Sequence, residues 1–158
     1  MPDLVPIPMP SRPAIPSMSA ESIDRVRRLE AVVRELPQVA IATEHVLHAG
    51  LYARTILVPA GTMITGVLIK IATLLIVQGD AVVFLDGESV RLRGYSVLPA
   101  SAGRKQAFVA QADTHLTMIF ATGATSVEAA EEEFTDEADL LWSRRAGAGG
   151  NRIVMTGE

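Results

Sequence analysis

Residues 38–125 form a series of short runs rich in Val, Ile, Leu and Thr, interrupted at short intervals by Gly and Pro. Such residues favour extended strands, and this punctuation is typical of a β-sandwich or β-barrel. We therefore predict an all-β fold, a jelly-roll-like β-barrel over residues 38–125, with a helix before it and a helix after it. The predicted strands are 39–43, 52–58, 63–69, 73–78, 81–85, 88–92, 95–98, 106–110 and 114–121.

Two turn signals are stronger than the others in this region. They are Gly79-Asp80 and Asp86-Gly87, because Gly and Asp tolerate the positive φ that tight hairpins require. We expect a hairpin at each of these positions.

The two flanking segments have helical patterns. Residues 19–37 carry apolar side chains at spacings of three and four, with Ser19 as the expected N-cap and Pro37 as the stop. Residues 126–145 are acidic at the start and basic at the end, as the helix dipole favours, and a break near Thr135-Asp136 fits the pattern.

The chain termini have a different composition. Residues 1–18 form a Pro-rich extended arm that carries apolar side chains, and residues 146–158 form a Gly-rich linker and tail. Two alternatives stay open for the arm: a disordered tail, or an arm that docks on its own barrel or on another subunit.

Composition excludes several kinds of partner. The formal net charge of −4 gives no electrostatic reason to expect nucleic acid binding, and a chain without cysteine has no disulfide and no thiolate metal site. The longest apolar run, 67–77, contains Lys70 and is much shorter than the roughly 20 residues that span a bilayer, so we expect no membrane partner.

Three short motifs carry a family resemblance. They are 50–54 (Gly-Leu-Tyr-Ala-Arg), 59–62 (Pro-Ala-Gly-Thr) and 103–105 (Gly-Arg-Lys). Over roughly residues 36–141 the chain resembles small cupin-like proteins encoded by phages and prophages. The resemblance implies a single cupin barrel with a helix before and after it, and a structural role for Arg54, which braces the first strands through a carboxylate or carbonyl groups.

The resemblance also indicates where a cupin would hold its metal. Those positions fall here on Val67, Ile69, Thr73 and Gln106, and Phe120 stands where the phage relatives tend to carry a histidine. Val and Ile have no lone pair, and neutral hydroxyl and amide groups are poor ligands for metals that prefer imidazole. We therefore predict a degenerate metal site, no cofactor and no catalytic residue, which favours a non-enzymatic protein.

The run 67–77 is apolar at both odd and even positions, so both faces of this segment need cover. We expect an interface within a homo-oligomer or a larger assembly, with the predicted members Leu4, Ile7, Leu68, Lys70, Leu74 and Ile76. A basic group, Arg91, Arg93, Arg104 and Lys105, has two interpretations: a small anion pocket, or a solvated basic face.

Three hypotheses about function follow. The preferred one is an oligomeric structural or accessory protein of a phage or prophage, in the host cytoplasm or the virion, with a closed, apolar barrel interior. One alternative is a metal-dependent cupin enzyme, an isomerase or dioxygenase, that uses His45, His48 or His115. The other is a sensor that binds an apolar ligand between Val67, Ile69 and Phe108, which requires an open cavity.

Overall fold

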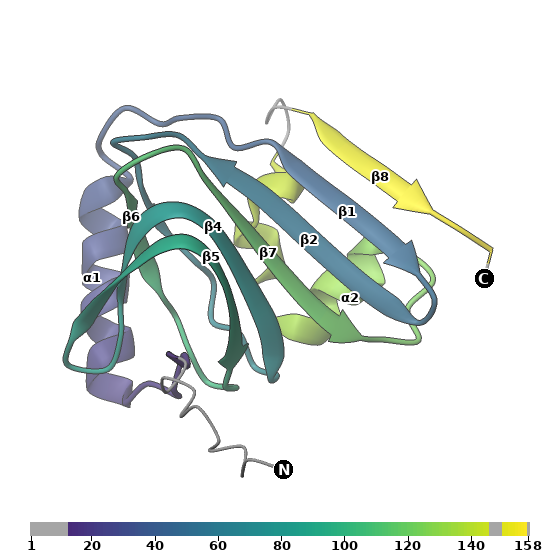
Figure 1. Ribbon diagram of the computed structural model, residues 1–158, viewed down its shortest axis with the longest axis horizontal. Helices are drawn as coiled ribbons and strands as arrows, with labels where there is room; N and C mark the ends of the chain where they lie inside the picture. Colours follow the sequence, from purple (N-terminus) through teal and green to yellow (C-terminus); the bar gives the residue numbers. More distant parts are fainter. Residues whose placement is uncertain (1–12, 146–149, 158) are drawn as a thin grey trace, which may run out of the picture.

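The computed structural model describes residues 13–145 and 150–157. Strands make up most of its regular secondary structure, with one helix before and one helix after the central strands along the sequence (Figure 1). The elements in chain order are α1 (Ala20–Val33), β1 (Thr43–His48), β2 (Leu51–Val58), β3 (Met63–Thr65), β4 (Thr73–Phe84), β5 (Ser89–Ala100), β6 (Ala107–Ala110), β7 (Thr114–Ala121), α2 (Val127–Phe134), the 3-10 turns η1 (Ala138–Leu140) and η2 (Trp142–Arg144), and β8 (Asn151–Met155).

The strands form one curled eight-stranded sheet in the order β3-β6-β4-β7-β2-β1-β8, with β5 paired along β4. The long strand β4 pairs with β7 through its first half and with β6 near its end. In Figure 1 the paired strands β4 and β5 arch together beside α1, while α2 lies next to β1, β2 and β7. This strand pairing confirms the predicted all-β fold with a helix before and after it.

Alternating side chains build two apolar clusters on the inner face of the sheet. Burial alternates along β7 and β2, which places every second residue inside. The first cluster, under the β4–β5 arch, contains Ile15, Val58, Leu75, Val77, Val83, Leu85, Leu92, Leu98, Ala100, Phe108, Ala110 and Leu116. The second, under α2, contains Leu47, Tyr52, Val67, Met118, Phe120, Val127, Ala130, Phe134, Ala138 and Leu141.

The predicted hairpin at Gly79-Asp80 is wrong. Both residues lie inside the continuous strand β4, and their partners in β5 are Gly94 and Arg93. Gly79 has φ +144°, and a Cβ there would meet Thr114 Oγ1 at 2.5 Å. The glycine therefore serves a bend in a strand rather than a turn between strands. The other signal, Asp86-Gly87, does lie in the connection between β4 and β5.

Both helices begin where the sequence predicts, but both end earlier than predicted. Ser19 caps α1 as predicted, since its Oγ accepts the backbone N–H of Ser22, but the helix ends at Val33 rather than at Pro37. Helix α2 stops at Phe134 because Thr135 is extended and its Oγ1 donates to the Leu68 carbonyl. The expected helix to residue 145 is thus replaced by α2 and two 3-10 turns, with the break at Thr135.

Several strand boundaries also differ from the prediction. β1 covers 43–48 rather than 39–43, and β3 ends at Thr65, well before residue 69. The tail forms an unpredicted strand, β8, parallel to β1. The Pro-rich arm docks through Ile15, which is buried, donates its N–H to the Pro99 carbonyl and forms a bridge to Ala100. The two interface positions expected nearer the start of the arm, Leu4 and Ile7, lie outside the described residues.

Candidate functional site: a cavity inside the curled sheet

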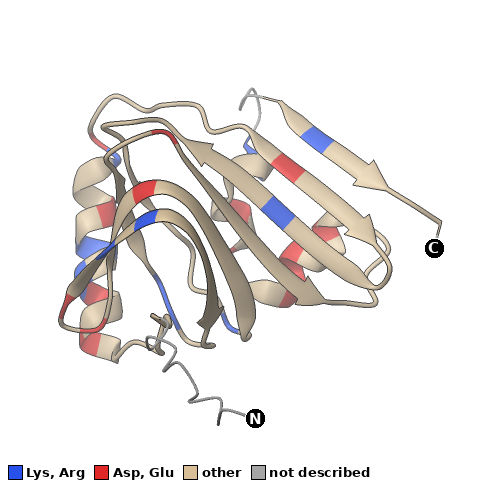
Figure 2. Cartoon of the chain, viewed as in Figure 1, with Lys and Arg blue, Asp and Glu red and all other residues tan. Residues whose placement is uncertain are grey.

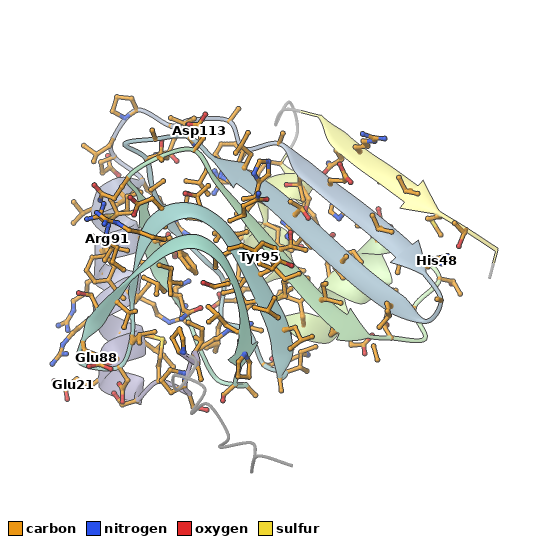
Figure 3. The ribbon with its side chains drawn as sticks, in the orientation of Figure 1. Glu21, His48, Glu88, Arg91, Tyr95 and Asp113 are labelled. Atoms are coloured by element: carbon orange, nitrogen blue, oxygen red, sulfur yellow. The ribbon has the colours of Figure 1, made fainter. Side chains whose placement is uncertain are left out.

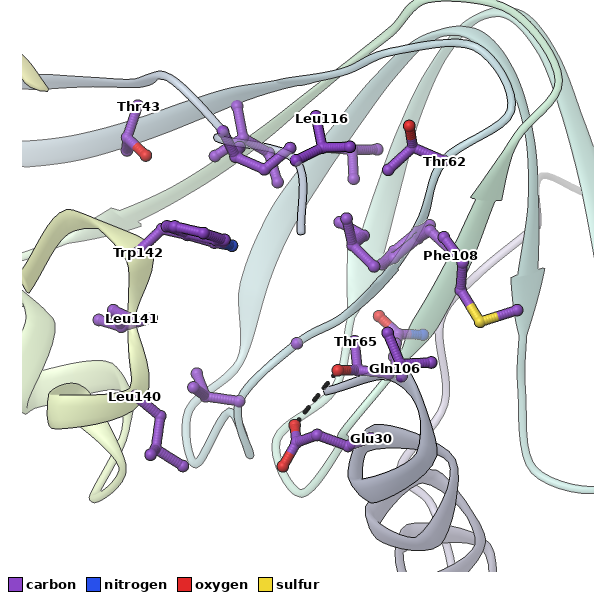
Figure 4. Close-up of a pocket in the computed structure, with 18 of the residues that line it drawn as sticks. Glu30, Thr43, Thr62, Thr65, Gln106, Phe108, Leu116, Leu140, Leu141 and Trp142 are labelled. Carbon is purple, nitrogen blue, oxygen red and sulfur yellow. Dashed lines mark hydrogen bonds between the residues drawn. The ribbon is translucent and has the colours of Figure 1, made fainter. Parts of the chain in front are cut away.

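The inner face of the sheet encloses a cavity of about 610 Å³ between the two apolar clusters (Figure 4). Its apolar lining comes from strands β2, β3, β4, β6 and β7, the C-terminal ends of α1 and α2, the turn η2 and the loop after β3. These residues include Ile56, Ile64, Val67, Ile69, Leu75, Phe108, Leu116, Met118, Phe134, Leu141 and Trp142. The expected closed, filled interior is therefore wrong: side chains from the sheet leave a space within the size range of small-molecule pockets.

The mouth of the cavity lies where lining residues are also exposed to solvent. Leu36 and Val39, in the segment between α1 and β1, are 56% and 46% exposed, and Leu140 of η1 is 40% exposed. Trp142 and Arg145 line the same side, with the Arg145 guanidinium carbon 4.6 Å from the centre of the indole ring. The entrance is thus apolar with a cationic edge.

Three of the four positions predicted to correspond to the metal ligands of a cupin line the cavity, and the fourth does not. Val67, Ile69 and Gln106 line the cavity, whereas Thr73 lies on β4 and accepts a hydrogen bond from Arg104. Two aliphatic side chains beside a guanidinium do not fit a divalent cation, which needs three or four donor side chains. The residues present therefore form a surface for apolar and anionic groups.

Arg104 is a buried cation in the cavity wall. It is 2% exposed, and its Nη1 donates to the Ser101 carbonyl at 2.7 Å and its Nη2 to Thr73 Oγ1 at 2.7 Å. Nη2 also faces the sulfur of Met118 at 3.9 Å, a weak acceptor. Among the described residues the hydrogen-bond partners of Arg104 include no carboxylate, and burial lowers the pKa of its guanidinium to about 10.

Two other polar groups of the cavity are buried without a hydrogen-bond partner in the described part of the chain. They are the amide nitrogen of Gln106 and the hydroxyl oxygen of Thr43. Gln106 lies two residues beyond Arg104 in an extended segment, so both side chains point to the same face. Thr43 lies on the opposite side of the cavity from Gln106 (Figure 4).

A buried ion pair joins the sheet to α2 beside the cavity. Arg54 Nη1 donates to Glu131 Oε2 at 2.9 Å, and Glu131 is 1% exposed. Arg144 and Ser143 also donate to this carboxylate. Arg54 was predicted to brace the first strands through a carboxylate or carbonyl groups; its partner is a carboxylate, but one that ties β2 to α2 rather than to another of the first strands. The acid partner was not singled out because the acidic start of α2 gives no sign of which glutamate is buried.

The proposed basic group does not come together. Arg91 and Arg93 lie on the outside of β5, where both contact Asp80, and Figure 3 shows Arg91 at the edge of the molecule. Lys105 points toward α1, with its Nζ 2.9 Å from Glu30 Oε2 and 2.8 Å from the Gly66 carbonyl oxygen. Arg104 alone of the four reaches the cavity.

The outer basic residues are partly neutralised by their neighbours. Arg91 donates two hydrogen bonds to the Asp80 carboxylate, and these bonds lower the pKa of that carboxyl group. Figure 2 shows acidic and basic segments next to each other across the β4–β5 arch. A solvated, mixed-charge face describes this region better than an anion pocket does.

The three histidines lie apart and point in different directions. His45 is buried on β1, where Nδ1 lies 2.7 Å from the Tyr52 hydroxyl and Nε2 2.9 Å from Asn151 Oδ1. His48, at the far end of β1, contacts Thr156, and His115 is exposed on β7. Within residues 13–145 and 150–157, no three His, Asp or Glu side chains gather in a metal-binding arrangement. The geometry therefore does not assemble the histidine site of the enzyme hypothesis.

The interface positions predicted in the run 67–77 lie on two different surfaces of the protein. Leu74 and Ile76 point to the outer face of the sheet, where Leu74 is 48% exposed. Leu68 and Lys70 lie against the segment after α2, because the Leu68 backbone binds Glu137 and Thr135 and Lys70 pairs with Asp136. Neither helix in the described part of the chain has the length and hydropathy of a membrane-spanning helix.

No family model and no curated protein matches this chain. Solved structures similar to it include a cupin superfamily protein from Desulfitobacterium hafniense, with 18% identity and a TM-score of 0.44 over 58% of this chain and 86% of that one. Another is the cupin domain of an XRE family transcriptional regulator from Enterobacter cloacae, with 13% identity and a TM-score of 0.43 over 51% and 96%. Ectoine synthase from P. lautus has 17% identity and a TM-score of 0.47 over 63% and 76%.

The first two of these structures are described as cupins, one of them a domain of a regulator, and the third is an enzyme. Likenesses of this size concern the fold alone. The candidate site is therefore defined by the chain's own geometry: a curled β-sheet with a half-open apolar cavity, a buried arginine and an amide nitrogen that has no hydrogen-bond partner among the described residues.

Proposed function

We propose that this protein is a cupin-like small-molecule-binding protein that holds an apolar ligand inside its curled sheet. The observation that carries the proposal is the cavity of about 610 Å³, whose lining is mostly aliphatic and aromatic with a few polar groups. Pockets of roughly 300–1,000 Å³ with this composition are typical small-molecule sites. Of the hypotheses drawn from the sequence, the ligand sensor agrees best with this geometry.

The positions expected for the ligand support this choice. Val67, Ile69 and Phe108 all line the cavity, as the sensor hypothesis requires. A protein that acts as a scaffold gains stability by filling its interior, since unfilled apolar space forfeits dispersion contacts. A bound apolar molecule would restore those contacts.

The polar groups of the cavity favour binding over catalysis. Arg104, Gln106 and Thr43 are hydrogen-bond donors, and none of the three changes its protonation state near neutral pH. A general acid or base needs a pKa near the operating pH. These three side chains can orient a ligand, which is the role of a receptor or sensor domain.

A neutral fluorescent probe tests the proposal. N-phenyl-1-naphthylamine should bind with increased emission, and Leu116→Trp, which fills the cavity from β7, should abolish this binding. Leu57→Trp is the matched control, because Leu57 points outward from β2 and is 38% exposed. Absence of probe binding, or equal binding to both variants in their folded forms, would contradict the proposal.

We also propose that the protein self-associates through the outer face of β4 and β5. This face carries Leu74, Ile76, Tyr95 and Val97, and Tyr95 is 66% exposed. The apolar surface continues from Leu74 to Ile119 of β7 across the ladder. A second copy of this chain offers the same apolar face, so a symmetric contact would cover both. The phage or virion role stays a prediction from the resemblance.

A further inference from the structure

We infer that the ligand of this cavity is an amphipathic carboxylate, an apolar molecule whose carboxylate group binds Arg104 and Gln106. The inference rests on the proposed binding function and adds the chemical class of the ligand. It depends on two donors that share one face of the segment before β6 and that both line the cavity.

The first donor is the Arg104 guanidinium, a charge that the described protein does not neutralise. Its oxygen partners are two backbone carbonyls, those of Ile71 and Ser101, and the hydroxyl of Thr73. Burying a cation without a counter-charge costs free energy. An anion that enters the cavity is attracted to Arg104 more strongly than it would be in water, because the dielectric constant inside the protein is lower. The Met118 sulfur next to Nη2 is a weak acceptor that a carboxylate oxygen can replace.

The second donor is the amide nitrogen of Gln106, which is buried and has no hydrogen-bond partner in the described part of the chain. Gln106 is 6% exposed, so water satisfies this donor poorly. A buried donor without an acceptor is destabilising, and a ligand that accepts a hydrogen bond from it removes this cost. The Arg104 guanidinium is also a pure donor and carries a charge without a counter-charge, so a hydrogen-bond acceptor with negative charge complements both groups.

The charges of the cavity wall support an anion in a protein whose overall charge is negative. The chain has a formal net charge of −4, yet the charged residues of the lining are Arg34, Arg54, Arg104, Arg145 and Glu30. Glu30 neutralises Arg34 and Glu131 neutralises Arg54. Within the described residues this leaves Arg104 inside and Arg145 at the mouth for an incoming anion.

A carboxylate fits this arrangement better than a larger anion. The guanidinium and the amide are both planar donors, and a planar carboxylate can accept from both with its two oxygens. The remaining lining is mostly apolar, and Phe108 lies near Gln106 (Figure 4). A ligand with a small anionic head and an apolar body satisfies both parts.

Matched pairs of competitors test the inference with the neutral probe already bound. Decanoate is compared with 1-decanol, and 2-naphthoate with 2-naphthalenemethanol, so that each pair differs in the head group alone. In at least one pair the carboxylate should displace N-phenyl-1-naphthylamine at a concentration at least about tenfold lower, the size expected for a charge-assisted hydrogen bond.

Two substitutions of Gln106 test whether its amide causes the preference for a carboxylate over an alcohol. Gln106→Leu removes the unpartnered amide and Gln106→Glu places a like charge beside the ligand; both should lower carboxylate affinity about tenfold or more while alcohol affinity changes little. Gln38→Leu is the matched control, because Gln38 also lines the cavity but already donates to the Val33 and Leu36 carbonyls. Its carboxylate preference should equal that of the wild type.

The outcomes separate the two proposals. Equal displacement by acid and alcohol in both pairs, or a preference that Gln106→Leu and Gln106→Glu leave unchanged, overturns the carboxylate inference and leaves the binding function standing. A wild-type protein that binds no neutral probe overturns the binding function and the inference together. Arg104 is not the first choice for substitution, because its contacts with Ser101 and Thr73 also hold the loop before β6.

Discussion

Gly79 and Gly94 lie directly opposite each other in the ladder between β4 and β5, and both have positive φ, +144° and +78°. At this point β4 leaves its pairing with β7, which ends at Gln78, and joins β6 from Ala81 onward. Two residues without side chains therefore allow a pair of long strands to bend together. The bend curls the sheet around the cavity, so the candidate site depends on it.

Substitution of Gly79 should be destabilising through the backbone. In Gly79→Ala the added Cβ would meet Thr114 Oγ1 at 2.5 Å and the Asp113 carbonyl oxygen at 2.7 Å, at a φ that other residues rarely adopt. We expect a loss of about 2–4 kcal/mol in the free energy of unfolding, measured by urea denaturation. Gly94→Ala meets no atom within 4 Å and should lose only about 1–2 kcal/mol. Equal losses would show that the contact with Thr114 is unimportant.

Neutralising Glu131 should destabilise the protein more than any surface ion pair. Glu131→Gln removes the charge that balances Arg54 and Arg144 inside the structure, with an expected loss of about 3 kcal/mol in the free energy of unfolding. The comparison is Asp136→Asn, which breaks the exposed pair with Lys70 and should cost less than about 1 kcal/mol. Similar unfolding midpoints for the two variants would contradict a structural role for the buried pair.

Stability should fall as the pH drops below 6.5, in part because of His45. Burial lowers the pKa of His45 from its ordinary value of 6.5, so the unfolded chain takes up a proton before the folded protein does. The contribution is complete above pH 6.5 and is lost as the pH falls from 6.5 to the lowered folded pKa. The measurement is the free energy of unfolding in urea at several pH values, for the wild type and for His45→Gln. The difference between the two isolates the contribution of His45, because the variant has no imidazole at this position to take up a proton.

His115 provides the control for this pH prediction. It is exposed on β7, so His115→Gln should keep the wild-type dependence of stability on pH. A wild-type slope that persists in His45→Gln would show that another group causes it.

An acidic residue on the outer face should prevent self-association. Leu74→Asp places a charge in the centre of the apolar face formed with Ile76 and Ile119, and we expect the oligomer to dissociate to monomers at micromolar concentration in analytical ultracentrifugation. Val32→Asp, at a position 63% exposed on α1, should leave the oligomer intact. A wild-type protein that is already monomeric would end the self-association proposal.

Much of the fold followed from the sequence where the pattern was local. The helix at Ser19, the strands β2 and β7 and the turn at Asp86-Gly87 were predicted because caps, alternation and turn residues act over a few positions. The break at Thr135 also agreed with the pattern. The bend at Gly79 was missed, because a glycine at a turn and a glycine at a strand bend look the same until the partner strand is known.

The sequence by itself determined the chemistry available to the site. The resemblance to cupins predicts that Val67, Ile69, Thr73 and Gln106 stand where those proteins carry metal ligands, and no fold can give Val or Ile a lone pair. Only the tertiary structure decided that the interior stays open and that Arg104 faces it while Lys105 turns to α1. A cavity is the space that distant segments leave when they pack, so no local pattern in the chain can specify it.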